Sequence, residues 1–473
     1  MNTEVAQVRT GSRAVRPNGL DLDIDTSIPA LILKVGQYPL HVGGLGAIRT
    51  LGRLGVPVYT ISEPGLTPAV ASRYCTGRFV RRTTVHELED VLVADLRSVG
   101  TQLGRRSVIV PTDDEAAVLA AEHAAELSDL FLLPAVPAGL PRRLASKPGL
   151  AELCRQHDIP CPASVTPAGL DELKAFAATA TFPVVIKNAE PWERRRRPVV
   201  PYTMVVRSRD ELLAIVGRSP WGSGRGYQDR SAGLILQEFI PDECSRDWGT
   251  DLYCTADASS TLVLTGLKVR TWPPVAGATS CGYSVLNPEV AALAERFCKE
   301  IGFSGIADLD WRLDLRDGQY KLVDFNPRLG SRFRLSETES GVDVVRAMHL
   351  DLTGREVPRA PQIEGKRIVL EHVDVPARIT YRLLAGRAGH PGPHRLPEPA
   401  PDRAGQGPAT TEFAWMAADD PLPFLVMLGY AGRAALTEAG RQARALALRL
   451  RTTRRWTARR GGGERAREEL PCR

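Results

Sequence analysis

The sequence lacks the cysteine patterns of disulfide frameworks and of zinc knuckles. Its eight cysteines are scattered over 473 residues with no Cys-x-x-Cys pair, and its His-x-x-x-His spacing, His390 and His394, lies in a proline-rich linker. Small disulfide-stapled domains and zinc knuckles depend on such spacings. We therefore expect bystander thiols, and the scattered cysteines and histidines indicate no nucleophile triad.

Long apolar runs are absent as well. No stretch of 18 apolar residues occurs, and residues 1–28 carry charges without the apolar core of a secretion signal. Neither a membrane span nor a signal peptide is therefore indicated. We expect a cytoplasmic protein without a membrane partner, and the length predicts two or three packed domains.

Positive charge is concentrated at one end of the chain. The net charge is +6, yet residues 440–473 alone hold 11 Arg against 3 Glu, which leaves the rest close to neutral. A nucleic-acid-binding arm is one interpretation of such a segment. Because its only aromatic residue is Trp456, we instead expect a solvated, partly disordered tail and no nucleic-acid partner.

The most informative stretch, residues 305–334, predicts two strands joined by a tight turn. In the first strand charged residues alternate with apolar ones, which is typical of a strand with one polar face. These charged residues are Asp308, Asp310, Arg312 and Asp314. In the second strand we expect one face to carry Tyr320, Leu322, Asp324 and Asn326.

The turn between these strands decides which residues face each other. A two-residue loop, Asp317 and Gly318, would put Asp310 opposite Phe325. A three-residue loop, 316–318, with Gly318 at positive φ puts Asp310 opposite Asp324. We favour the second register because Gly318 stands where that loop needs a glycine.

Two carboxylates that face each other across a ladder repel unless a positive charge lies between them. The hairpin therefore predicts a cation site, and Mg²⁺ fits an all-oxygen set of Asp310, Asp324 and Asn326 completed by phosphate oxygens. Arg328 would lie close to such a phosphate. The alternative is an ordinary amphipathic hairpin with a solvated face.

The hairpin resembles the metal-binding core of the ATP-grasp superfamily. That pattern has an acid on one strand and acid-x-Asn-x-Arg on the next, matched here by Asp310, Asp324, Asn326 and Arg328. The aspartates stand where the family often has glutamates. The resemblance covers about residues 30–355 and implies an α/β protein in which two α+β subdomains grip ATP, with Mg²⁺ as cofactor.

The stretch before this part predicts a doubly wound parallel α/β domain. Residues 30–35 and 56–61 form two expected strands, and a glycine-rich turn and a helix lie between them. The glycines do not follow Gly-x-Gly-x-x-Gly, so a dinucleotide site is not expected. His41 in the turn is either a small-molecule contact or structural.

Further nucleotide contacts follow from the resemblance. Lys187 ends an apolar strand, so its ammonium group must reach water or an anion, and the family uses this lysine on phosphates. Lys147 matches the family's first nucleotide-contacting lysine. The implied adenine and ribose contacts are Gln237, backbone groups of Glu238 and Ile240, and Glu243.

Catalytic groups are expected around the transferred phosphoryl group. Arg328 is one, and Lys268 and Arg270 precede a small-residue loop at 273–282 that would enclose an acyl phosphate; an ordinary sheet edge is the alternative. Two loops, 194–197 and 221–226, are candidates for closing over the phosphates. Arg332 and Arg334 are candidates for gripping a substrate carboxylate.

The resemblance implies an ATP-dependent ligase that joins a small-molecule carboxylate to an amine. The product is an amide (peptide-type) bond between amino acids or similar substrates, formed through an acyl phosphate with release of ADP and phosphate. The alternatives are a carboxyphosphate-forming carboxylase of the biotin or purine type, although no Met-Lys-Met occurs, and a non-catalytic nucleotide-binding scaffold.

The expected division of the chain has five parts. They are a flexible lead-in (1–28), the first α/β domain (29–140), the ATP-grasp domain (141–355), a small C-terminal region (356–439) and the basic tail (440–473). An apolar helix near residues 421–428 is one option for forming a homodimer.

Overall fold

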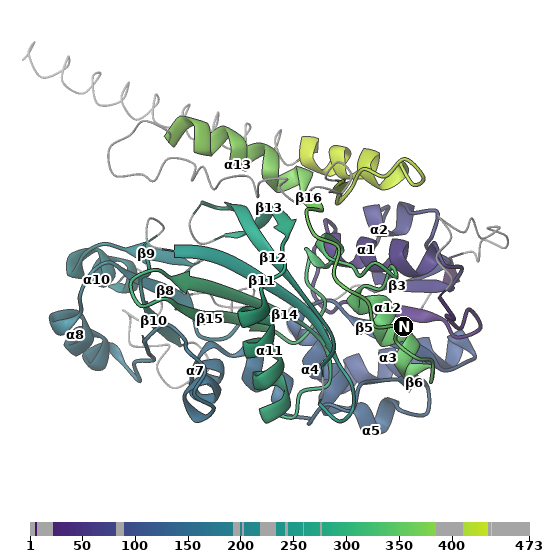
Figure 1. The fold of residues 1–473 in the computed structure, drawn as a ribbon, viewed down its shortest axis with the longest axis horizontal. Helices are drawn as coiled ribbons and strands as arrows, with labels where there is room; N and C mark the ends of the chain where they lie inside the picture. Colours follow the sequence, from purple (N-terminus) through teal and green to yellow (C-terminus); the bar gives the residue numbers. More distant parts are fainter. Residues whose placement is uncertain are drawn as a thin grey trace, which may run out of the picture.

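The computed structural model describes residues 5–6, 22–81, 89–192, 199–200, 203–217, 233–241, 245–258, 260–274, 277–384, 410–433 and 437. Three sheets organise this part of the chain (Figure 1). A mostly parallel sheet lies at one end, a small antiparallel sheet at the other, and a large sheet between them.

The first sheet has six strands in the order β1-β4-β3-β2-β5-β6, parallel except for β1. They are β1 (Val5–Ala6), β2 (Ala30–Leu33), β3 (Val58–Ser62), β4 (Gly77–Val80), β5 (Ser107–Pro111) and β6 (Phe131–Leu132). The helices between them are α1 (Val42–Gly52), α2 (Pro68–Ala71), α3 (Glu89–Leu103), α4 (Asp114–Glu122) and α5 (Ala124–Leu127). Helices cover both faces, as a doubly wound sheet requires.

Strand β2 shows how this layering arises. All four of its residues are buried, as expected for a parallel strand covered on both sides. Ala30 and Ile32 pack with α1 and with α12 (Val344–Leu352), whereas Leu31 and Leu33 pack with α3 and α4. Helix α12 follows the hairpin of residues 305–326 in sequence, so the first sheet is completed by a distant part of the chain.

The small sheet has four antiparallel strands in the order β7-β10-β8-β9. They are β7 (Ser164–Val165), β8 (Val184–Asn188), β9 (Met204–Val206) and β10 (Leu234–Glu238). Helices α8 (Leu170–Thr179) and α10 (Arg209–Gly217) pack on it through one apolar core that includes Leu173 and Leu212.

The large sheet has the order β15-β14-β11-β12-β13-β16-β17. Its strands are β11 (Ser245–Cys254), β12 (Ser260–Trp272), β13 (Ala278–Ser284), β14 (Gly305–Asp314), β15 (Gln319–Asn326), β16 (Arg367–Val369) and β17 (Thr411–Phe413). One face packs against α6 (Leu140–Ala145), α7 (Lys147–Gln156) and α11 (Pro288–Glu300). A short 3₁₀ helix, η3 (Phe333–Leu335), follows the hairpin.

The β14–β15 hairpin has the predicted Asp310–Asp324 pairing, but it reaches that pairing by a different route. Asp314 pairs with Gln319, so the loop has four residues rather than three, and Gly318 sits at its end with φ 75°. A register shift between Asp310 and Trp311 then leaves Val323 as an extra residue on β15. This β-bulge restores the pairing of Asp310 with Asp324.

The bulge also corrects the predicted face of β15. Leu322 pairs with Trp311 and lies in the same apolar core as Phe325, with Tyr320 packed against it. Tyr320 and Leu322 therefore do not share a face with Asp324 and Asn326, because the extra residue reverses the alternation between them.

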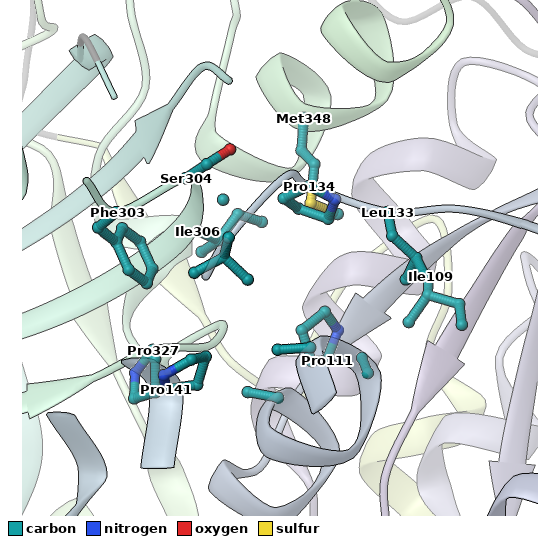
Figure 2. A pocket seen from close by; sticks show the side chains of 15 residues that line it. Ile109, Pro111, Leu133, Pro134, Pro141, Phe303, Ser304, Ile306, Pro327 and Met348 are labelled. Carbon is teal, nitrogen blue, oxygen red and sulfur yellow. The ribbon is translucent and has the colours of Figure 1, made fainter. Parts of the chain in front are cut away.

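The seam between the first sheet and the hairpin contains an apolar hollow. Its walls come from β5, from β14, from Pro327 after the hairpin and from Met348 of α12 (Figure 2). Ser304 supplies the only side-chain hydroxyl, and that group donates to the carbonyl oxygen of Cys254 at 3.4 Å. The hollow therefore offers no charged group that would bind a polyphosphate.

Two helices near the C-terminus form a layer over β13 and the first sheet (Figure 1). Helix α13 (Glu371–Leu384) and a helix at residues 422–433 lie there together (Figure 1). Buried Arg49 of α1 donates to Asp420 at 2.9 Å, and Ser72 donates to the same carboxylate at 2.7 Å. No helix in the described residues is long and apolar enough to span a membrane.

Replacing Gly318 by Ala tests the turn that sets the hairpin. We expect the free energy of unfolding to fall by about 1 kcal/mol, because an L-residue at positive φ is strained. Gly139→Ala is the matched control, since Gly139 has φ −79° and neither position has a neighbour that a β-carbon would meet within 4 Å. The two variants should differ in their free energy of unfolding, measured with urea. Equal losses of this free energy would contradict the role given to Gly318 in the turn.

Buried His372 is expected to make the stability of the protein depend on pH. Burial lowers its pKa to about 4, and its Nδ1 accepts a hydrogen bond from Trp415 Nε1 at 2.9 Å. As the pH falls, the unfolded chain therefore binds a proton at a higher pH than the folded protein does. The contribution of His372 to the free energy of unfolding is fully present above pH 6.5, and about 3 kcal/mol is lost as the pH falls to 4. His372→Asn keeps an acceptor but cannot titrate, and its unfolding free energy should fall less over this range. Identical pH profiles would refute the assignment.

Candidate active site

Asp310 and Asp324 face each other across the β14–β15 ladder, and each side chain is about a quarter exposed. Lys268 Nζ lies 2.6 Å from Asp310 Oδ1, and Lys147 forms an ion pair with Asp324. Burial opposes ionisation of both carboxyl groups, yet the nearby cations hold their pKa values below the usual range. Side chains of the protein thus offset the repulsion predicted between the two carboxylates.

The donor set fits Mg²⁺. Besides the two carboxylates it includes Asn326, whose amide orientation is fixed because Nδ2 donates to the Asp308 carbonyl at 3.0 Å. Its Oδ1 accepts from Arg328 Nη2 at 2.8 Å. No cluster of three or more His, Cys, Asp or Glu side chains that could hold a metal occurs in the described ranges. One or two carboxylates completed by phosphate oxygens are the usual protein share of a magnesium site.

Two lysines are held together beside this pair. Lys147 begins α7, and its backbone N–H donates to the carbonyl of Ala189 at 2.9 Å, just beyond the end of β8. Lys187 lies on β8, where burial lowers its pKa to about 8 although Asp324 opposes the shift. Among the described residues Lys187 forms no ion pair within 4 Å, so its ammonium group is available to an anion.

Arg328 joins the hairpin to helix α4 of the first sheet. Its Nε lies 3.3 Å from Asp114 at the start of α4, and its Nη1 lies 3.5 Å from Asp308. Asp113 beside it caps α4 and accepts N–H groups from residues 35 and 36, which orders the loop after β2. The cluster therefore lies where the carboxyl ends of parallel strands meet, the usual ligand-binding edge of such sheets.

His41 lies in the loop at this edge. Burial lowers its pKa to about 3, and the ring stacks edge-on against Tyr38 at 5.0 Å between centroids. A β-carbon on Gly44 would overlap the ring. The imidazole is therefore neutral and tightly packed, which favours the structural interpretation.

Arg332 is a member of the site that the strand pattern does not reveal. It is 5% exposed, and its guanidinium bridges Asp308 and Asp310 and lies 3.7 Å from Asp251. Burial raises the pKa of Asp251 to about 7, although Arg332 opposes the shift. Space for the guanidinium exists because Gly249 stands opposite Asp310 on β11, and a β-carbon there would overlap Arg332.

Comparisons with known proteins add the family context. No protein-family model matches the chain. It is 26% identical to a D-aspartate ligase of Enterococcus faecium over 260 residues, 51% of this chain and 58% of the relative. The chain thus spans little more than half the length of that curated relative.

Two solved structures share the fold. One is a biotin carboxylase domain of Hydrogenobacter thermophilus 2-oxoglutarate carboxylase with MgADP and bicarbonate, at TM-score 0.52 and 14% identity over 70% of this chain and 71% of that one. The other is an L-amino acid ligase from Bacillus licheniformis, at 0.50 and 17% over 70% and 75%. The chain has the ATP-grasp fold. The predicted fold class is confirmed.

The expected adenine segment of the ATP-grasp fold lies on β10. Gln237 is buried there between β7 and β8, and the backbone N–H of Glu238 donates to the Ala163 carbonyl at 2.8 Å. The Ile240 carbonyl accepts from Arg312 Nη1 at 3.0 Å. Glu243 and the candidate closing loops, 194–197 and 221–226, lie outside the described residues.

Lys268 and Arg270 do not act as the expected pair of cations. A bulge on β12 pairs Lys268 with Gly282 but Arg270 with the next residue, Cys281, so the two side chains point to opposite faces of the ATP-grasp sheet. Arg270 instead forms an ion pair with buried Asp374 of α13 at 2.8 Å. The structure therefore removes Arg270 from the catalytic set.

Arg334 is likewise held in ion pairs with carboxylates of the protein. It pairs with Asp343 at 2.7 Å and with Glu412 at 2.9 Å. Neither it nor Arg332 is free to grip a substrate carboxylate in this structure. The sequence did contain one sign of the space that Arg332 occupies. On β11 Gly249 stands between Asp247 and Asp251 in the alternation, at a position where a strand usually carries a larger side chain.

Replacing Arg332 by Met should destabilise the protein by about 3–5 kcal/mol, because it leaves buried carboxylates without their cation. Arg97→Met is the matched control, since it breaks an exposed ion pair with Asp129 that is worth less than about 1 kcal/mol. Adding Asp308→Asn to Arg332→Met should recover part of the loss in urea unfolding. Equal losses in the Arg332 and Arg97 variants would contradict the network.

Proposed function

We propose that the protein is an ATP- and Mg²⁺-dependent carboxylate-amine ligase. It forms an amide bond through an acyl phosphate and releases ADP and phosphate. The proposal rests on one observation, the carboxylate pair Asp310–Asp324 with cations around it. These cations are Lys147, Lys187, Lys268 and Arg328. The similarity to a D-aspartate ligase supports the same reaction class.

The chemistry explains why so many charges gather here. A carboxylate is a poor electrophile, so the γ-phosphoryl group of ATP is first moved onto one of its oxygens. The amine then attacks the acyl carbon, and phosphate leaves with its bond electrons. Protein groups contribute chiefly by positioning these reactants and by stabilising charge that develops on the phosphoryl oxygens.

Each residue then has a defined role. Lys147 and Lys187 hold the phosphates, since they lie together at the ends of α7 and β8. Arg328 and Lys268 stabilise the charge on the transferred group. Asp310, Asp324 and Asn326 would hold Mg²⁺, which when bound neutralises and orients the β- and γ-phosphates.

The nucleotide base is proposed to lie along β10. Backbone groups of Glu238 and Ile240 would pair with its edge, Gln237 would meet its amino group, and Glu243 would lie near the ribose. Arg316 and Lys321 pair with the Glu238 carboxylate, which fixes this strand end against the hairpin.

We further propose that both substrates are amino acids or similar small molecules, and that the enzyme works in the cytoplasm where ATP and Mg²⁺ are available. Cys154, Cys161, Cys281 and Cys298 form no disulfide, which suits a reducing compartment. A homodimer stays a prediction.

Incubation with ATP, Mg²⁺ and pooled amino acids tests the reaction. We expect ADP, phosphate and a product lighter than its two substrates by one water, detected by mass spectrometry. Bicarbonate-dependent turnover would favour a carboxylase, and ATP binding without turnover would favour a scaffold. Release of AMP would contradict the mechanism.

Asp324→Asn should lower turnover at least about a hundredfold while the fold is kept, because it weakens the metal site and the anchor of Lys147. Asp317→Asn is the matched control, since that aspartate lies in the same hairpin but in its exposed turn. Steady-state ADP release and circular dichroism provide the two readouts. Full activity in the Asp324 variant would count decisively against the metal assignment.

A further inference from the structure

The C-terminal layer has one face that is fixed to the body of the protein. On α13, Asp374 is buried and accepts from Arg270 at 2.8 Å and from Ser280 at 3.1 Å. On the helix at 422–433, Met427 is buried in a core shared with Trp415. Because both helices are anchored through these inner faces, their outer faces are the free ones.

The outer faces carry large apolar side chains in helical register. On α13, Val375, Ile379 and Leu383 recur every four residues, and Leu383 is 72% exposed. On the second helix, Leu422, Leu425 and Leu428 recur every three, and Leu425 is 59% exposed. Stripes of this size on adjacent helices normally mark an interaction surface.

The remaining exposed residues on these helices decide what the surface fits. We call the surface the apolar-basic patch; it comprises Val375, Arg378, Ile379, Arg382, Leu383, Leu422, Leu425, Leu428 and Arg433. In the described parts of both helices no acidic residue is exposed, since Glu371 accepts backbone N–H groups of residues 415 and 416 and Asp374 is buried. The patch therefore combines apolar side chains with three arginines, of which Arg378 lies 4.0 Å from buried Asp374.

We propose that the apolar-basic patch docks on an anionic lipid bilayer surface. Helices that present Leu and Ile beside Arg are suited to the boundary between acyl chains and head groups. The adjoining segment 440–473, with 11 Arg against 3 Glu, adds attraction to negative head groups. This contact is independent of the proposed ligase reaction.

A second copy of the chain fits the patch less well. A two-fold interface brings the same surface of both subunits together, so the arginines of the patch would face a surface whose described helices expose no acid to pair with them. Lipid phosphates supply the missing negative charge.

The inference modifies one sequence-based expectation. The absence of a long apolar run argues against a membrane span, and no described helix could provide one. Surface binding needs no span, because only the outer halves of two short helices enter the boundary. The proposal therefore concerns peripheral contacts, and for these it revises the expectation of no membrane partner.

Flotation with vesicles tests the proposal on the full-length protein. Vesicles of phosphatidylcholine and phosphatidylglycerol should carry the protein to the top of the gradient, and vesicles of phosphatidylcholine alone should not. Ile379→Glu with Leu425→Glu should weaken binding at least about tenfold, because two inserted side chains become charged. Leu286→Glu with Leu315→Glu adds the same charge at exposed positions outside the patch and should change binding far less.

Arginine substitution gives a second readout. Arg378→Gln and Arg382→Gln should each weaken binding to the anionic vesicles about fivefold, the effect of one surface charge. None of the patch variants should alter ADP release in solution, because these residues lie outside the active site. Unchanged activity also shows that the variants are folded.

Three outcomes would overturn the proposal. The first is no flotation with anionic vesicles. The second is equal binding by the patch variant and the Leu286/Leu315 control, which would assign binding to the arginine-rich segment alone. The third is a dimer in analytical ultracentrifugation that Ile379→Glu with Leu425→Glu dissociates, which would make the patch a self-interface.

Discussion

Two negative side chains pressed together by a β-ladder impose the main constraint on this molecule. Asp310 and Asp324 can occupy adjacent strands only if positive groups surround them. The chain brings Lys147 from a helix terminus, Lys268 from a strand two places away and Arg332 from the segment after the hairpin. Elements from several parts of the large sheet therefore place charged side chains in one small region. The same cations are of the kind that bind a polyphosphate.

Much of this arrangement could be read from the sequence, but not the irregularities. Alternation of charged and apolar residues located the hairpin, and Asp310 does face Asp324. The bulge at Val323 could not be foreseen, because valine is an ordinary strand residue and nothing near it marks an extra position. A second bulge on β12 turned Arg270 away from Lys268. A strict period of two assigns faces wrongly beyond each bulge.

Packing also crosses the divisions drawn along the sequence. Helix α12, which follows the hairpin, completes the core of the first sheet, and Arg328 links the hairpin to Asp114. The C-terminal layer binds α1 through Asp420 and the large sheet through β16. Local composition predicts where elements begin and end, whereas these long-range contacts depend on tertiary geometry that no short window contains.

The absence of a side chain at Gly249 has a consequence for how the site can change in evolution. The guanidinium of Arg332 occupies the volume that a side chain at 249 would fill. Loss of the arginine would leave a void beside three acids, and gain of a side chain at 249 would evict the arginine. Related sequences should therefore change these two positions as a pair, so that covariation between them records which lineages kept this charge arrangement.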